Sequence, residues 1–324
     1  MEPTPQSAPT SRLKNFPIAW FAVVMGLSGL SMAWHRAETV LALPIHLSAY
    51  LLSFTLLAFT LIALLYLAKT LRYRQAVAAE FSHPIKLNFF PTISIALVLL
   101  GTALLPYQAI VAQALWALGA TLHLLFTLYV LSVWIHHSRF EIQHINPAWF
   151  IPIVGNILVP VAGVHFASPE ISWFFFSIGL LFWLVLLAIN FYRMIFHQPL
   201  AERMLPTLFI LVAPPAVGFI SWLQLTDSLD AFARILYYSG IFLTLMLLTQ
   251  IRRFARLKFF LSWWAYSFPM AAITIATLLM TQRLQLAFFH GLSVLLLALL
   301  TLLILGLTLR TLLAVIRKEI CIEE

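Results

Sequence analysis

Long apolar runs separated by short polar breaks form the main pattern of this chain. The runs match the roughly 20 helical residues that a hydrocarbon core of about 30 Å requires, and they lack the two-residue alternation of a membrane barrel strand. They predict ten membrane-spanning helices. The expected ranges are 16–36, 45–70, 87–105, 109–136, 147–166, 171–196, 204–224, 231–251, 259–280 and 286–316.

Lysine and arginine are unevenly divided between the two sides that these ranges imply. With the N-terminus inside, sixteen of the nineteen basic residues fall on cytoplasmic segments, and the outer loops hold only Arg36, Arg234 and Arg283. Cytoplasmic loops of membrane proteins carry such an excess. We therefore expect both termini in the cytoplasm, with a tail at 1–15, a pore domain at 16–317 and a tail at 318–324.

Proline follows a second pattern, because it falls on alternate runs. The odd-numbered runs and their entrances hold Pro17, Pro84, Pro91, Pro147, Pro152, Pro160, Pro206, Pro214, Pro215 and Pro269, whereas the interiors of the even-numbered runs hold none. An interior proline costs about 3 kcal/mol in a helix, so its repeated use suggests a shared role. The pattern predicts five helical hairpins, with an inner ring of five kinked odd helices around a pore and an outer ring of five straight helices. The alternative is that proline is simply common in membrane helices.

Composition supports an all-α integral membrane protein. Hydrophobic residues make up 62% of the chain and charged residues 9%, which excludes a soluble globular domain. The net charge of +8 follows the loop pattern, so we expect contact with anionic lipid and not with nucleic acid. The single cysteine, Cys321, excludes a disulfide within the chain.

Titratable groups are scarce inside the predicted helices. All eleven acids fall at or beyond helix ends, so no carboxylate is expected as a proton relay at the membrane midplane. His123 lies deep in the fourth run, and a neutral histidine bonded to a neighbouring helix is favoured over proton transfer. The spacing of His136, His137 and His144 matches no familiar metal site. Since enzyme motifs are also missing, we expect no enzyme activity, cofactor or metal.

A conduit through the odd helices would have an apolar to weakly polar wall. Its candidate lining residues are Ala22, Met25, Gly26, Ser94, Asn156, Val217 and Phe268, although Asn156 could instead tie two helices together. Backbone dipoles freed by proline stabilise an anion weakly, without the acidic rings of cation channels. The segment 72–83 is predicted to be an amphipathic helix at the membrane interface.

Four stretches on the odd runs are typical of one transporter family. They read FPIAWFAVVMGLSGLSMAW from Phe16, EFSHPIKLNFFP from Glu80, NPAWFIPIVGNILVP from Asn146, and WWAYSFPMAAITIATL from Trp263. Over nearly the whole membrane region, the chain resembles the tellurite-resistance/dicarboxylate transporter family, which includes plant slow-type anion channels and fungal malate and sulfite transporters. The resemblance implies a homotrimer in which the five odd helices of each protomer form a pore.

The same resemblance implies that Phe268 plugs this pore midway. Pro269 would free a backbone carbonyl and bend the helix, and the small side chains of Ala271 and Ala272 would leave room for a ring that moves. The alternative is that Phe268 only packs between helices. Phe89 and Phe90 are candidates for a second occluding ring.

The leading hypothesis is a gated, passive channel for small anions in the bacterial inner membrane. The alternative is a carrier or exporter for C4-dicarboxylates such as malate, or for sulfite. Tellurite resistance could follow from anion exit through either. A membrane scaffold without flux is the third hypothesis.

Overall fold

The computed structural model describes residues 11–138 and 140–322, and every regular element in those ranges is a helix. Ten helices are long and apolar enough to cross a membrane, which confirms the predicted spans. They are Ile18–Val40, Leu47–Arg72, Lys86–Leu104, Ala109–His136, Pro147–Phe166, Pro169–Phe196, Glu202–Thr226, Ala231–Leu248, Leu261–Leu284 and Ala287–Ile316. We call them spans 1 to 10.

The odd and even spans differ in their backbone. Each odd span begins with 3₁₀-helix and continues as α-helix: η1 (Ile18–Trp20) and α1 (Phe21–Val40); η2 (Lys86–Phe89) and α4 (Thr92–Leu104); η4 (Pro147–Phe150), α6 (Ile151–Val154), η5 (Gly155–Leu158) and α7 (Val159–Phe166); η6 (Glu202–Val212) and α9 (Ala213–Thr226); η7 (Leu261–Tyr266) and α12 (Ser267–Leu284). The even spans are the single helices α2 (Leu47–Arg72), α5 (Ala109–His136), α8 (Pro169–Phe196), α10 (Ala231–Leu248) and α13 (Ala287–Ile316). Since proline removes a backbone donor and hinders the α-helical turn before it, the prolines of the odd spans account for much of this tighter winding.

Burial follows the same division. In the odd spans 72–89% of the most apolar window is buried, compared with 22–39% in the even spans. Contacts between odd spans follow a closed circuit, from α1 through α4, α7, α9 and α12 back to α1. Each odd span also packs against the even span that follows it in the chain.

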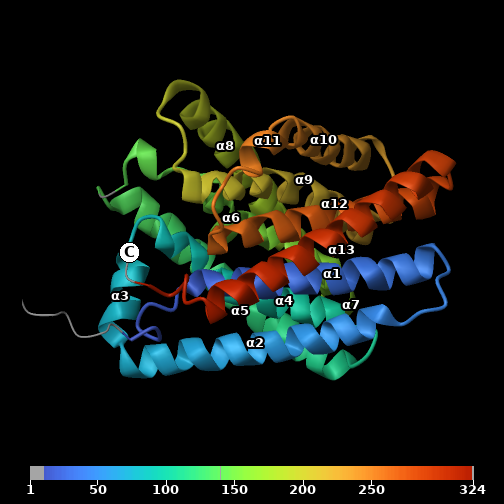
Figure 1. Cartoon of the computed structure of the whole chain (residues 1–324). Helices are drawn as coiled ribbons and strands as arrows, with labels where there is room; N and C mark the ends of the chain where they lie inside the picture. Colours follow the sequence, from blue (N-terminus) through green and yellow to red (C-terminus); the bar gives the residue numbers. More distant parts are fainter. Residues whose placement is uncertain (1–10, 139, 323–324) are drawn as a thin grey trace, which may run out of the picture.

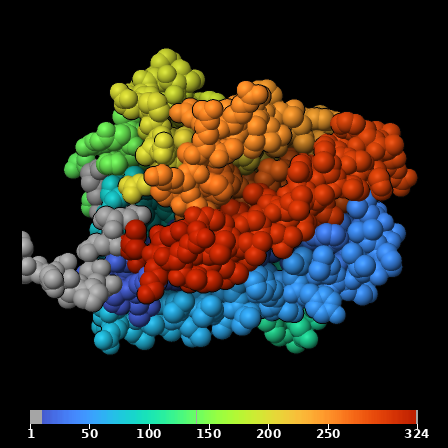
Figure 2. Space-filling view, viewed as in Figure 1, coloured from blue at the N-terminus to red at the C-terminus, as the bar shows by residue number. Residues whose placement is uncertain are grey.

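The last helix, α13, covers the junction of the first and ninth spans. It crosses the face in Figure 2 as the red helix, and it contacts both α1 and α12. Two indole groups hold it there: Trp34 Nε1 donates to Thr301 Oγ1 at 3.1 Å, and Trp264 Nε1 donates to Thr311 Oγ1 at 2.9 Å. A tryptophan that donates to a neighbouring helix satisfies its buried N–H and fixes the packing.

The two ends of the bundle differ in the chain segments that lie there. The start of α1 and the C-terminal segment after α13 lie at one end (Figure 1), which we call the terminal end. Short helices gather there, namely α3 (Arg74–Ser82), η3 (Ile142–His144) and α11 (Ile251–Phe254). The loop end is the opposite end, where α1 leads into α2 and α12 leads into α13. All odd spans therefore run in the same direction, from the terminal end to the loop end.

Candidate functional site

A cavity of about 170 Å³ lies inside the circuit of odd spans, and all five spans contribute to its wall. On each helix the lining residues, single or in adjacent pairs, return after three or four positions, as one face of an α-helix requires. They are Ser31, Met32, His35 and Arg36 on span 1; Leu99, Thr102 and Ala103 on span 3 with Leu105, Pro106 and Tyr107 after it; Leu158, Val161 and His165 on span 5; Val217, Ile220 and Gln224 on span 7; Phe268, Ala272 and Ile275 on span 9.

Phe268 lies at the inner end of this cavity. It belongs to the first turn of α12, directly after the 3₁₀ segment η7, and no lining residue of span 9 precedes it. All other residues from 267 to 281 are buried, whereas Phe268 is only partly buried, because its ring faces open space. The lining of span 9 continues to Ile275, about 10 Å along the helix toward the loop end.

The backbone around Phe268 is held by close packing between α1 and α12. A Cβ atom added to Gly29 would lie 2.6 Å from Ala271 Cβ and 3.6 Å from Phe268 Cδ2. Ser267 Oγ donates to the carbonyl of Trp264 at 2.5 Å, in the turn that precedes Pro269. Glycine and alanine thus let the two helices approach beside the ring, as small residues do in membrane helix pairs.

The loop end of the cavity is basic and polar. His35 and Arg36 approach it from α1, His165 from α7 and Gln224 from α9. Sequence reasoning had placed Arg36 in an outer loop because the first span was expected to end there. The helix instead continues to Val40, and this draws Arg36 into the cavity wall.

The predicted lining residues do not all face the cavity. Val217 lies in its wall, as does Ala272, which was predicted as support for the gate. Ser94 is fully buried and lies 2.9 Å from His123 Nδ1 on α5, and Asn156 Nδ2 donates to Thr127 Oγ1 on the same helix at 2.9 Å. Ser94 and Asn156 therefore tie odd spans to an even span.

The remaining candidates pack against other helices or stay outside the cavity lining. Gly26 faces α12, where an added Cβ would lie 2.2 Å from Ser267 Oγ. The Phe90 ring packs edge-on against Phe81 of α3, with ring centroids 4.7 Å apart, and Phe89 is partly buried. The cavity lining also lacks Ala22, Met25, Pro269 and Ala271. Ala22 is partly buried, and the other three are buried.

Histidines take two kinds of position. His123 is 1% exposed, and its Nε2 lies against Gly155, where an added Cβ would be 2.5 Å away. It is therefore packed among odd spans, next to Ser94. Within the part of the chain that the structure describes, no three metal-ligating side chains come together, and the histidines at 136, 137 and 144 are no exception.

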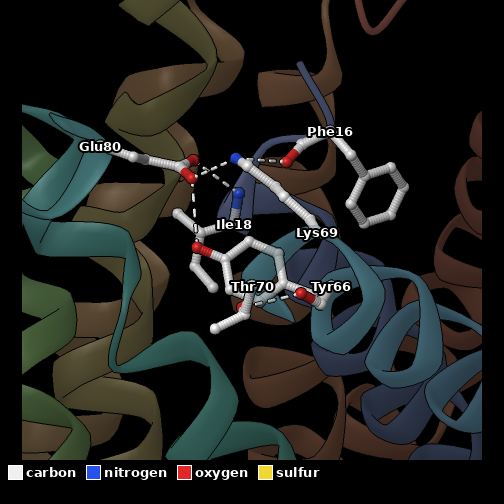
Figure 3. Close-up of polar contacts among 6 residues, drawn as sticks. All are labelled: Phe16, Ile18, Tyr66, Lys69, Thr70 and Glu80. Carbon is white, nitrogen blue, oxygen red and sulfur yellow. Dashed lines mark hydrogen bonds and ion pairs between the residues drawn. The ribbon is translucent and has the colours of Figure 1, made fainter. Parts of the chain in front are cut away.

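A buried ion pair at the terminal end was not predicted from the sequence (Figure 3). Lys69 Nζ lies 2.6 Å from Glu80 Oε2 and donates to the carbonyl of Phe16 at 2.8 Å. Glu80 also accepts from the backbone N–H of Ile18 at 2.8 Å and from the hydroxyl of Tyr66 at 3.1 Å. The amphipathic segment 72–83 thus holds a charged residue that joins α2, α3 and the start of span 1.

The relatives of this chain include proteins named as anion channels, as transporters and as a tellurite resistance protein. S-type anion channel SLAH2 of Arabidopsis thaliana is 31% identical in an alignment of 276 residues that covers 82% of this chain and 53% of the plant protein. An uncharacterized transporter of Methanocaldococcus jannaschii is 28% identical over 291 residues, 82% of this chain and 85% of the relative. The tellurite resistance protein TehA homolog of Haemophilus influenzae is 24% identical over 283 residues, 86% of this chain and 83% of the relative.

The chain therefore spans about half the length of the plant relative and most of the two microbial ones. The model of the voltage-dependent anion channel family, SLAC1, matches residues 15–312 and so includes all ten spans except the end of the last. This match confirms the resemblance that the four odd-span motifs indicated. The chain is a multi-pass membrane protein, and it belongs to the voltage-dependent anion channel family.

Proposed function

We propose that this protein is a gated, passive channel for small anions, with its pore inside the circuit of five odd spans. The observation that carries the proposal is a cavity to which all five odd spans contribute and whose lining on span 9 begins at Phe268. A hydrophobic ring across a narrow lumen excludes water and ions, as hydrophobic constrictions do in other channels. Phe268 is then the gate, and Pro269 and Ala271 support it from the packed side of α12.

The charges at the cavity support anions over cations. Among the described residues that line it, none is aspartate or glutamate, whereas Arg36 and two histidines approach its loop end. A low-dielectric wall with charges of one sign concentrates ions of the opposite sign. The missing carboxylate also supports passive flow, since coupled transporters usually place an acidic group on the ion route.

Removing the ring tests the gate directly. We expect Phe268→Ala to raise chloride current in planar bilayers by at least about tenfold, because the side chain that blocks the lumen is deleted. Phe242→Ala is the matched control, since Phe242 is 66% exposed on the outer face of α10 and should leave the current unchanged. A folded Phe268→Ala variant with wild-type current would contradict the gate.

A carrier for C4-dicarboxylates or sulfite is the second candidate. The cavity favours it in one respect, because a binding chamber that opens at one end and closes at Phe268 is also what alternating access requires. Saturable exchange of labelled malate or sulfite by the wild-type protein, without chloride current in Phe268→Ala, would support the carrier. Tellurite resistance would then be a consequence of anion exit.

The assembly that we propose is a homotrimer in the inner membrane, with both termini in the cytoplasm. The exposed apolar faces of α2, α5, α8, α10 and α13 provide surface for lipid and for neighbouring protomers. The mass of the detergent-solubilised complex, measured by light scattering, tests the trimer. A mass of one chain would contradict it.

A further inference from the structure

Arg36 is an unusual residue in the wall of this cavity. It lies in the last turns of α1, is only partly exposed, and shares the lining with residues of the other odd spans. Within the described ranges, its guanidinium makes no hydrogen bond and no ion pair. Placing a charged group in a largely apolar wall is costly unless a partner compensates it.

Two acids near the loop end, Glu38 and Asp227, have partners other than Arg36. Both carboxylate oxygens of Glu38 accept from Ser48, from its backbone N–H at 2.8 Å and from its hydroxyl at 2.5 Å. Asp227 is paired with Arg283. Arg283 itself is near enough for its field to act on Arg36, and it has the same sign. The positive charge of Arg36 is therefore left for something outside the chain.

Other hydrogen-bond donors face the same space. His35, His165 and Gln224 are among the residues that line the cavity, and their imidazole and carboxamide groups carry N–H donors. Across residues 11–138 and 140–322, none of these three side chains makes a hydrogen bond with protein. Together with Arg36, they surround the open end of the cavity from α1, α7 and α9.

We propose that Arg36 binds the incoming anion at the loop end, and that the site prefers a small carboxylate or other oxyanion over a halide. This inference rests on the proposed role of the cavity as an anion route. The planar guanidinium presents paired N–H groups that match two oxygens of one anion, whereas a spherical halide accepts from them without that geometry. The cavity of about 170 Å³ has room for a small carboxylate with several waters, each of which takes about 30 Å³ in the liquid.

Binding can be tested without any flux. The thermal unfolding midpoint of purified protein would be measured in sodium formate and in sodium chloride of equal ionic strength. We expect formate to raise the wild-type midpoint by a few degrees relative to chloride, because a ligand that binds only the folded state stabilises it. Arg36→Gln should lose this difference, and Arg36→Lys, which keeps the charge without the paired donors, should retain only part of it.

Arg234→Gln is the matched control. Arg234 also lies at the loop end, in the first turn of α10, but it is exposed and outside the cavity lining. The control removes the same charge and should keep the formate effect. Equal losses in Arg36→Gln and Arg234→Gln would overturn the site in favour of general surface charge, and a full formate effect in Arg36→Gln would overturn it outright.

The relative permeability of formate and chloride, measured in the Phe268→Ala variant, is a second test of the Arg36 site. Adding Arg36→Gln should lower the permeability ratio of formate to chloride about tenfold, the expected effect of losing a charge-assisted hydrogen bond, and adding Arg234→Gln should not. An unchanged ratio with Arg36→Gln would count against the site. If Phe268→Ala carries no current, the proposed channel fails, while formate stabilisation still decides whether Arg36 binds an anion.

Discussion

Lys69 and Arg36 are basic side chains near the ends of neighbouring helices, yet their surroundings are opposite. Lys69, at the terminal end of α2, is 3% exposed and has both a carboxylate and a carbonyl within 2.8 Å. Arg36, at the loop end of α1, lines a cavity and forms no ion pair with an acid among the residues that the structure describes. A compensated charge in a dry site organises the chain around it, whereas an uncompensated charge beside a cavity is available to a ligand.

The compensated site also positions the pore wall. Glu80 accepts from the N–H of Ile18, the first residue of η1, and Lys69 donates to Phe16 just before it. These bonds supply partners to backbone groups at the start of the first odd span, which would otherwise remain unsatisfied at a buried helix end. The ion pair therefore fixes where span 1 begins, and α1 of the same span packs beside Phe268 through Gly29.

Breaking the ion pair should have the largest effect on stability. We expect Glu80→Gln to destabilise the protein by about 3–5 kcal/mol, because it leaves Lys69 buried without its counter-charge. The thermal unfolding midpoint in detergent would fall accordingly. Glu202→Gln, at an exposed position, serves as the control and should change little.

A double variant sharpens this test. Lys69→Met combined with Glu80→Leu removes both charges and should recover much of the lost stability, since replacing a whole buried pair with apolar groups is often neutral. If the double variant is no more stable than Glu80→Gln, the loss comes from packing and not from the unpaired charge.

Removing the uncompensated charge should have a much smaller effect. We expect Arg36→Gln in chloride buffer to change the free energy of unfolding by less than about 1 kcal/mol, because the structure gives its guanidinium no partner to lose. The same unfolding experiment measures it. A loss as large as that of Glu80→Gln would show that Arg36 is a structural residue, and the contrast between the two sites would disappear.

The smallest effect is expected at Glu38, two residues after Arg36 on α1. Glu38→Gln removes a negative charge near the open end, so it should raise anion current in the Phe268→Ala background by about twofold or less at 0.1 M salt. At 1 M salt the gain should vanish, because the screening length falls from about 10 Å to about 3 Å. Ser48→Ala keeps the charge and should not raise the current.

The sequence predicted the spans well because hydropathy and helix length are local properties. No predicted end is more than four residues from the observed one, and the alternation of proline matches the alternation of mixed and single helices. The rotation of each helix was harder to predict. Odd spans are apolar all round, so the pattern does not indicate which face meets the cavity. Ser94 and Asn156 were therefore candidates for the lining, although they face α5.

The two charged sites were missed for different reasons. Arg36 was missed because a helix end is weakly encoded, and α1 extends four residues beyond the predicted end at that residue. Glu80 was read as part of an interfacial segment, since its burial depends on Lys69 and Tyr66 from another helix. An ion pair between two helices leaves no periodic pattern in the sequence. An acid and a base on two segments that are joined by a short connection could still have suggested it.

If the cavity behind Phe268 is an anion route, deleting the ring should give an anion-selective current. The most direct measurement is the reversal potential of Phe268→Ala in a planar bilayer with a tenfold KCl gradient. We expect a value near the chloride equilibrium potential, about 59 mV in magnitude for a univalent ion. A value near the potassium potential, or no current from folded protein, would contradict it.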